Sequence, residues 1–246
     1  MAQLDFEAVQ AYVEENVKKF HEVRLAKLKE LTLDDLLRRK NPYLFRSKYL
    51  ETAPEFVRAL IDDHVSSAGE TQFGNFLEMV AIFVCRQVFG GRKSTTRGID
   101  LEFDRDGYRN IVAIKSGPNW GNASQIAKMR ADFKDAAKTL RTSHSGLNVK
   151  AINGCCYGRD DNPDKGDYWK LCGQRFWNYI SGSDSLYLDL IKPLAHEADR
   201  RSLAFRDEYA RKVNLLTTDF GKRFCTTGRI DWDALVRFNS AARAKR

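Results

Sequence analysis

The chain has 246 residues, of which 43% are hydrophobic and 11% aromatic, so it can bury a substantial core and is not a disordered protein. It contains no run of 18 apolar residues, and its acidic start does not resemble a secretory signal peptide, which predicts a cytoplasmic protein without a membrane segment. The formal net charge of +8 favours a polyanionic partner, with nucleic acid as the first candidate.

Apolar residues recur at helical spacing in four stretches of the N-terminal half, and each stretch is predicted to be a helix. These stretches are residues 5–30, 33–40, 54–65 and 73–88. Gly90-Gly91 ends the last of them, because glycine readily leaves the helical conformation. The five cysteines have neither the spacing nor the neighbouring histidines of a zinc site, and we expect buried free thiols.

The second half of the chain mixes strands and helices. Two short strands flank Asp106-Gly107, a helix follows over residues 124–140, and a strand follows over residues 149–158. Residues 167–180 and 185–216 have helical spacing. This order predicts an α/β fold with substantial helical additions.

We expect one folded unit overall, in which three segments can be distinguished. They are an N-terminal helical segment over residues 1–50, a core with helical additions over residues 51–220, and a C-terminal extension over residues 221–246.

The dipeptide Asp106-Gly107 is a strong signal for a two-residue hairpin turn, and it fixes which residues of the two strands face each other. Side chains alternate along each strand, so Asp100 and Glu102 share one face with Ala113 and Lys115. Apolar residues occupy the other face, which we expect to pack on the core. They are Ile99, Leu101, Val112 and Ile114.

The polar face of this hairpin has the residue types that phosphodiester cleavage needs. Carboxylates bind a hard divalent cation, which polarises phosphate and activates water. The ammonium of Lys115 can orient the attacking water and balance the charge of the phosphate. The alternative is a salt bridge on a solvated sheet face, but the "SGPNWGN" loop that follows Lys115 is an unusual continuation for a solvated edge.

Asp100 on one strand and Lys115 on the next resemble the motif of the PD-(D/E)xK nuclease superfamily. Five blocks extend the likeness to a family of type II restriction endonucleases over most of residues 40–220: "FGNFLEMVAIFV", "GIDLEF", "IKSGPNWGNASQ", "NGCCYG" and "KLCGQRFWNYISG". The resemblance implies a restriction-endonuclease-like core, a mixed central sheet flanked by helices. It also implies Mg²⁺-dependent cleavage of double-stranded DNA, with Mn²⁺ as a substitute, by a homodimer that has a cognate DNA methyltransferase as its genetic partner.

The chain departs from the motif at one position, because Ala113 stands where the second acid is expected. Three explanations remain open. Glu78 on the preceding helix supplies the carboxylate, which we favour, or Glu102 supplies it, or the alanine silences the enzyme. The resemblance implies that Glu78 or Glu102, Asp100 and the Ile114 carbonyl hold the metal.

Ten residues around this hairpin are candidates for contact with DNA. They are Lys93, Arg97, Ser116, Asn119, Trp120, Asn122, Ser124, Gln125, Lys128 and Arg159. Amide side chains can read base edges and basic side chains can bind phosphates. For Asn119 and Asn122 the alternative is turn chemistry, and for the basic residues it is a solvated surface.

Two other functions stay open at this point. One is a structure-specific or repair nuclease of the same superfamily. The other is a non-catalytic DNA-binding relative, for which Ala113 is the main argument.

Overall fold

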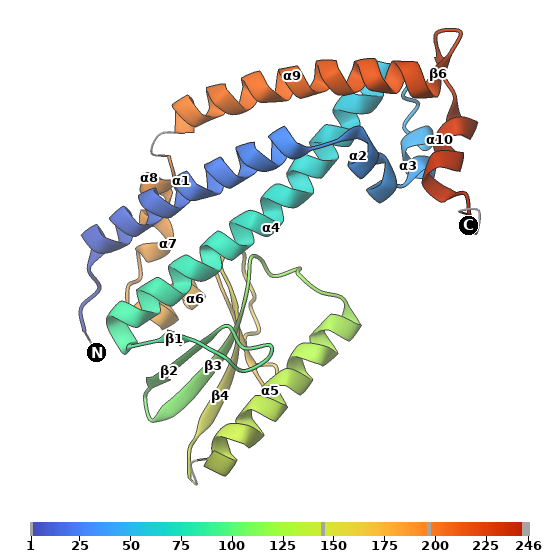
Figure 1. Cartoon of the computed structure of the whole chain (residues 1–246). Coiled ribbons are helices and arrows are strands. Elements are labelled where there is room, and N and C mark those ends of the chain that lie inside the picture. Colours follow the sequence, from blue (N-terminus) through green and yellow to red (C-terminus); the bar gives the residue numbers. More distant parts are fainter. Residues whose placement is uncertain (1, 144–145, 196–197, 243–246) are drawn as a thin grey trace. The chain divides into compact units, whose positions relative to one another are not determined.

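The computed structural model describes residues 2–143, 146–195 and 198–242 (Figure 1). The chain divides into two compact units, one within residues 1–18 and 72–196 and the other within residues 19–71 and 197–246. The expected N-terminal segment and C-terminal extension contribute residues 19–50 and 221–242 to the second unit. None of the helices in the described part of the chain is both long enough and apolar enough to cross a lipid bilayer.

The first unit is built on a five-stranded sheet in which the strands follow one another in chain order. The strands are β1 (Arg92–Lys93), β2 (Leu101–Arg105), β3 (Tyr108–Lys115), β4 (Val149–Cys155) and β5 (Trp169–Cys172). β1, β2 and β3 pair antiparallel, whereas β3, β4 and β5 pair parallel. A mixed central sheet with helices against it confirms the predicted fold class.

The β2–β3 hairpin has the predicted register. Arg105 faces Tyr108 across a two-residue turn. Asp106 and Gly107 have φ angles of 53° and 78°, the left-handed pair that a type I′ turn requires. Asp tolerates this conformation and Gly adopts it freely, which explains why the dipeptide predicts the turn.

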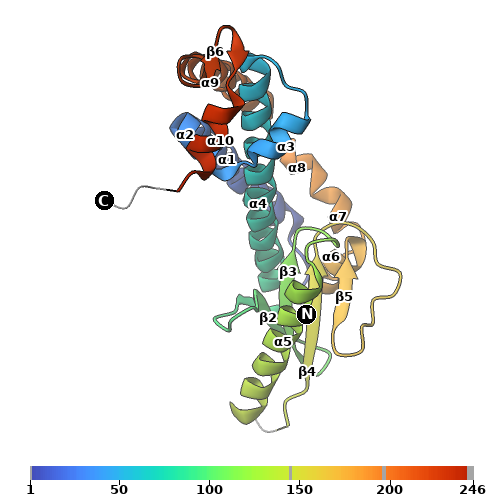
Figure 2. The ribbon, with the colours of Figure 1, turned by 90° about the vertical axis from the view of Figure 1, so that its right-hand side faces the viewer.

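One face of the sheet is covered by α5 (Ala123–Ser143), which lies along β3 and β4 (Figures 1 and 2). Ile111 and Ala113 of β3 are buried there against apolar side chains of the helix, Met129, Phe133 and Ala136. Ile99 also belongs to this cluster, so the prediction that Ile99 shares a face of the sheet with Leu101 is wrong. Because β2 begins only at Leu101, the alternation of the strand does not extend back to residue 99.

The opposite face of the sheet is also buried. Phe103 of β2 stacks on Phe89, the last residue of α4, with ring centroids 5.5 Å apart. A Cβ atom on Gly154 of β4 would lie 2.2 Å from the Phe176 ring of α6 (Gln174–Ser181), so only glycine fits at this position. Both faces of β3 therefore lie in a packed core, and the solvated sheet face considered as an alternative does not exist at Ala113.

Two predicted boundaries are wrong. α4 (Ala53–Phe89) is one continuous helix through Gly69, where a break between two helices was expected. An isolated glycine costs a helix only about 1 kcal/mol, less than the packing of the residues on either side contributes. Residues 169–172 form a strand rather than the start of a helix, because they pair with β4 and Gly173 turns the chain at φ 54°.

The remaining elements of the first unit are helical. α1 (Phe6–Glu30) matches its prediction, and its residues 6–18 belong to this unit. Its Tyr12 stacks on Phe83 with ring centroids 4.0 Å apart. α7 (Leu186–Asp189) and α8 (Ile191–Leu194) form single turns that end near Pro193, where a longer helix was expected. Proline has no backbone N–H and therefore interrupts a helix.

The second unit is helical, with its own aromatic core. Its further elements are α2 (Leu33–Arg39), α3 (Pro42–Ser47), α9 (Ala198–Phe224), β6 (Cys225–Thr226), β7 (Arg229–Ile230) and α10 (Trp232–Ser240). Phe56 contacts the rings of Phe45, Phe220 and Trp232 at its centre. The buried Lys212 donates to the Leu31 carbonyl at 2.9 Å, just beyond the end of α1.

All five cysteines lie among the described residues and are free. Four of them are buried, as predicted: Cys85, Cys155, Cys156 and Cys172. Cys225 is half-buried.

Candidate active site

The candidate catalytic residues gather where the parallel strands end. The pairing places Lys115, Cys155 and Cys172 at the same level of β3, β4 and β5. β2 runs antiparallel to β3, so Asp100, just ahead of β2, reaches the same edge, where its N–H donates to the Val112 carbonyl at 2.8 Å. The carboxyl ends of strands are the usual ligand-binding edge of an α/β sheet.

Asp100 is half-buried and held by the backbone. Its Oδ2 accepts a hydrogen bond from the N–H of Ile114 at 2.7 Å. Burial raises the pKa of Asp100, the hydrogen bond from Ile114 opposes this, and the charge of Glu78 raises the pKa further. Lys115 and Lys93 lower it, so Asp100 lies within electrostatic reach of one carboxylate and two ammonium groups.

Glu78 reaches this edge from α4. Its Oε1 lies 3.4 Å from Nζ of Lys93 on β1, and the side chain is 22% exposed. Sequence spacing alone could not place Glu78 beside Asp100, but α4 and the hairpin bring them together. Asp100 and Glu78 are therefore the two candidate metal-binding carboxylates that lie within electrostatic reach of each other.

This donor set fits a hard divalent cation. Two neighbouring carboxyl groups repel each other when both are ionised, so they are stabilised by a nearby positive charge. Mg²⁺ also prefers oxygen ligands. Within the described ranges, no group of three or more His, Cys, Asp or Glu side chains could hold a metal. A cation at this edge would therefore depend on the two carboxylates together with backbone oxygen and water, and Mg²⁺ usually keeps several waters.

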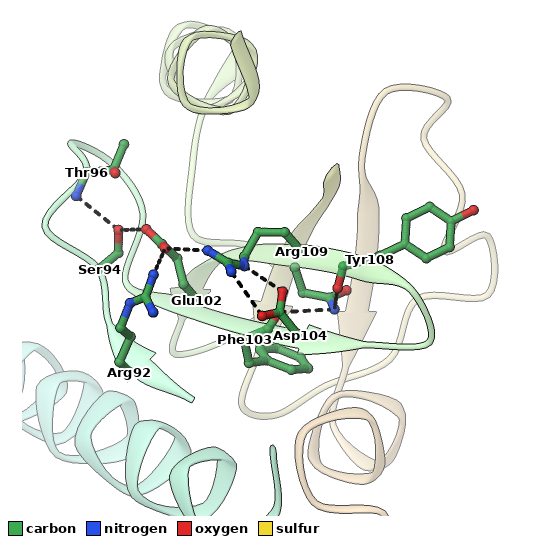
Figure 3. Close-up of polar contacts among 9 residues, drawn as sticks. Arg92, Ser94, Thr96, Glu102, Phe103, Asp104, Tyr108 and Arg109 are labelled. Carbon is green, nitrogen blue, oxygen red and sulfur yellow. Dashed lines mark hydrogen bonds and ion pairs between the residues drawn. The ribbon is translucent and has the colours of Figure 1, made fainter. Parts of the chain in front are cut away.

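Glu102 has a different environment, drawn in Figure 3. Its carboxylate accepts from Ser94 Oγ at 2.5 Å and from Arg92 at 3.1 Å, and Arg109 lies 3.8 Å away. Ser94 Oγ in turn accepts from the N–H of Thr96 at 3.0 Å. Through these contacts the buried Glu102 holds in place the loop that leads from β1 to Asp100.

Sequence reasoning missed these partners of Glu102. Arg109 faces Asp104 across the hairpin and forms two hydrogen bonds with it, at 2.6 and 2.9 Å (Figure 3). The alternation of side chains could have revealed Arg109, because the hairpin register puts it on the same face as Glu102. Arg92 and Ser94 belong to β1 and its loop, for which the sequence has no strand signal.

Ala113, at the place of the missing acid, is 1% exposed. Its side chain packs in the apolar cluster under α5, and its carbonyl accepts from Nδ2 of Asn153 at 3.2 Å. The position is therefore filled by apolar packing rather than left as a gap beside Asp100.

Three of the candidates for DNA contact form the start of α5. The side chain of Asn122 accepts from Ser124 Oγ at 2.8 Å and from the N–H of Gln125 at 3.1 Å. The side chain of Gln125 accepts from the N–H of Asn122 at 2.9 Å. This is a capping box, which satisfies otherwise unpaired amides at a helix start. All three side chains remain exposed.

Trp120 is half-buried against the apolar cluster under α5. Its indole N–H donates to Oδ1 of Asn153 at 3.1 Å, and Nζ of Lys115 lies 5.2 Å from the centre of a Trp120 ring. Asn119 beside it is exposed, and Ser116 is half-buried next to Lys115. Asn153 was missed by sequence reasoning, although an asparagine inside a predicted buried strand is itself a signal.

The basic candidates lie on the surface of the first unit. Lys93, Arg97, Lys128 and Arg159 are all exposed, and Lys128 pairs with Asp132 at 3.1 Å. Arg159 lines an open cavity of about 480 Å³ at the carboxyl ends of β4 and β5. Open cavities with converging polar groups are the usual form of a binding site.

The comparisons with known proteins bear on the family of the chain. No curated protein matches the chain. A family model described as type II restriction endonuclease EcoO109I matches residues 7–202, a range that contains Glu78, Asp100 and Lys115. The match covers most of the chain, including the whole sheet. The chain therefore belongs to the EcoO109I family of type II restriction endonucleases.

Proposed function

We propose that the protein cleaves double-stranded DNA at a specific sequence by metal-dependent hydrolysis of the phosphodiester bond. The observation that carries this proposal is the meeting of Asp100, Glu78 and Lys115 at one edge of the sheet in a chain of a restriction-endonuclease family. Water attacks phosphorus, the bond to the 3′ oxygen breaks, and the products carry a 5′-phosphate and a 3′-hydroxyl.

Asp100, Glu78 and the Ile114 carbonyl would hold Mg²⁺, for which Mn²⁺ can substitute. The cation supplies Lewis-acid chemistry, polarising the phosphate and making a bound water more acidic. The N–H of Ile114 fixes one oxygen of Asp100. The half-buried position of Asp100 keeps the local dielectric low, which strengthens its attraction for a cation.

Lys115 is proposed to orient the attacking water and to neutralise charge that develops on the phosphate. Its ammonium lies close enough to lower the pKa of Asp100, so both groups can face one phosphate. Fixed positive charge aimed at the developing negative charge is among the largest contributions to catalysis. Glu102 is proposed to act as an anchor of the β1–β2 loop, in place of the metal ligand considered from the sequence.

DNA contact is proposed for the exposed or half-buried polar and basic side chains around this edge: Lys93, Arg97, Ser116, Asn119, Asn122, Ser124, Gln125, Lys128 and Arg159. Basic side chains bind phosphates, while amide side chains can read bases. A palindromic target would be met by a homodimer with matching two-fold symmetry, and a cognate DNA methyltransferase would protect the host sites.

The test is incubation of unmethylated phage DNA with the protein in Mg²⁺ and in Mn²⁺. Discrete fragments are expected, and their ends map the recognition sequence. Asp100→Asn should abolish them, since the variant keeps the shape of the side chain and removes its charge. DNA binding in Ca²⁺ shows whether the variant still recognises its target.

Two other results would overturn the proposal in different ways. A smear of fragments would indicate a structure-specific or repair nuclease without a recognition sequence. Binding without cleavage in either cation would indicate a non-catalytic DNA-binding relative.

A further inference from the structure

A buried asparagine links the catalytic strand to the loop that follows it. Asn153 is 1% exposed in the middle of β4, directly opposite Ala113 of β3. Its Nδ2 donates to the Ala113 carbonyl at 3.2 Å and its Oδ1 accepts from the Trp120 indole at 3.1 Å. Buried amides are costly unless they are hydrogen-bonded. Asn153 donates one N–H to a residue before Lys115 and accepts a hydrogen bond from a residue after it.

The Trp120 ring, held in this way, lies beside the Lys115 ammonium at 5.2 Å. The face of an aromatic ring carries partial negative charge, so it attracts a cation without neutralising it. A carboxylate in the same place would form an ion pair and compete with phosphate for the ammonium. Ala113, two residues before Lys115 on the same face of β3, has no polar side-chain group that could form an ion pair with the lysine.

We propose that Trp120 is a positioning residue, which Asn153 orients and which holds the Lys115 ammonium toward the scissile phosphate while leaving its charge available. The inference rests on the proposed catalytic role of Lys115. It replaces the contact with DNA that the sequence suggested for Trp120, because the indole N–H is already bonded to Asn153 and the ring packs against the cluster around Ile111.

The test compares variants that keep or remove the ring. Trp120→Leu should lower the single-turnover cleavage rate roughly 10- to 30-fold, the scale of one well-ordered cation–π contact. Trp120→Phe should recover only part of that loss, since it keeps a ring beside the ammonium but lacks the N–H that Asn153 accepts. Asn153→Ala should lower the rate with the tryptophan still present, because the indole loses its fixed orientation.

The affinity for a short duplex that carries the mapped site, measured by fluorescence anisotropy in Ca²⁺, should change less than about twofold in all three variants. Trp169→Leu is the matched control. Trp169 also lies beside a lysine, with Nζ of Lys150 at 4.8 Å, but at the amino end of β5. This variant should keep the wild-type rate.

The outcomes separate this inference from the proposed function. If Lys115→Met cleaves like the wild type, the proposed catalytic role fails, whatever Trp120 does. If Lys115→Met is inactive and Trp120→Leu keeps the full rate, only the inference fails. Equal losses of rate and affinity would show that Trp120 contacts DNA, which overturns it. A Trp120→Phe variant with unchanged melting temperature and the rate of Trp120→Leu also overturns it.

Discussion

Two lysines of the central sheet lie beside tryptophan rings, at opposite ends of the parallel strands. Lys115 ends β3 and lies 5.2 Å from the Trp120 ring, while Lys150, near the start of β4, lies 4.8 Å from the Trp169 ring. The two contacts are nearly the same, but their surroundings differ. Lys115 has Asp100 within electrostatic reach.

Lys150 is surrounded by aromatic rings instead. The rings of Tyr108 and Tyr179 lie 6.0 and 5.4 Å from its Nζ, in addition to that of Trp169. Tyr179 is tied to the sheet by a hydrogen bond from its hydroxyl to the buried Asn110 at 2.7 Å. A lysine that lies beside a tryptophan can therefore be a purely structural contact, as Lys150 is. Carboxylates near the ammonium are what make such a lysine a candidate for catalysis.

The largest expected difference between the two ends concerns the lysines themselves. Lys115→Met should lower the cleavage rate about 1000-fold, within the usual range for loss of a group that assists proton transfer or stabilises charge. Lys150→Met should stay within about twofold of the wild type, because its ammonium contacts rings far from Asp100. Single-turnover cleavage of the same duplex measures both. Equal losses of cleavage rate in the two variants would show that the two ends of the parallel strands do not differ in function.

A second substitution adds a carboxylate to the catalytic end. Ala113→Glu restores the acid of the sequence motif, but its side chain enters a buried apolar cluster. Burial of an uncompensated charge should lower the free energy of unfolding by about 3 kcal/mol or more. Urea denaturation measures this loss, with Ala113→Ser as a milder control. An Ala113→Glu protein of wild-type stability and higher activity would show that this end accepts a third acid.

The two candidate acids should separate into a catalytic and a structural residue. Glu78→Gln should lower the cleavage rate about 100-fold at unchanged melting temperature, since its carboxylate pairs with an exposed lysine. Glu102→Gln should instead lower the free energy of unfolding by about 2 kcal/mol, because the buried contacts to Arg92 and Ser94 weaken. Rates and urea midpoints are measured on both variants. The reverse pattern would make Glu102 the metal ligand.

The smallest effect is expected at the far end of the hairpin, where Arg109 holds Asp104. The hydrogen bonds from Arg109 keep the pKa of Asp104 below its ordinary value. A carboxyl group whose pKa is lower in the folded protein stabilises the fold at pH values above its pKa in the unfolded chain. This stabilisation is lost as the pH falls through its pKa in the folded protein. As pH falls below about 4, the ordinary aspartate pKa, wild type should lose stability more steeply than Asp104→Asn. Urea midpoints across this range check the slope, and parallel curves would contradict it.

The sequence predicted the hairpin and its register because both depend on local chemistry. The Asp106-Gly107 turn fixes the register, and the register alone puts Asp100 near the end of the strand that carries Lys115. The hydrogen bond between Asp100 and Ile114 follows directly from this pairing.

The rest of the site depends on contacts between segments distant in sequence. Asn153 meets Trp120 only because β4 lies parallel to β3, and the hydrophobic pattern does not state which strands are neighbours. β5 was taken for a helix because four residues contain too little pattern to separate the two structures. Glu78 was found through the family resemblance, since its helix carries no local sign of facing Asp100.

The burial of the thiols has a consequence for chemical labelling. Burial raises the pKa of Cys85 and Cys156 to about 12, and it also raises the pKa of Cys155 and Cys172, so these thiols are protonated and shielded at neutral pH. Cys225 is half-buried in the second unit, whereas Asp100 and Lys115 belong to the first. A maleimide dye should therefore attach first at Cys225, giving a single reporter whose position leaves Asp100 and Lys115 untouched.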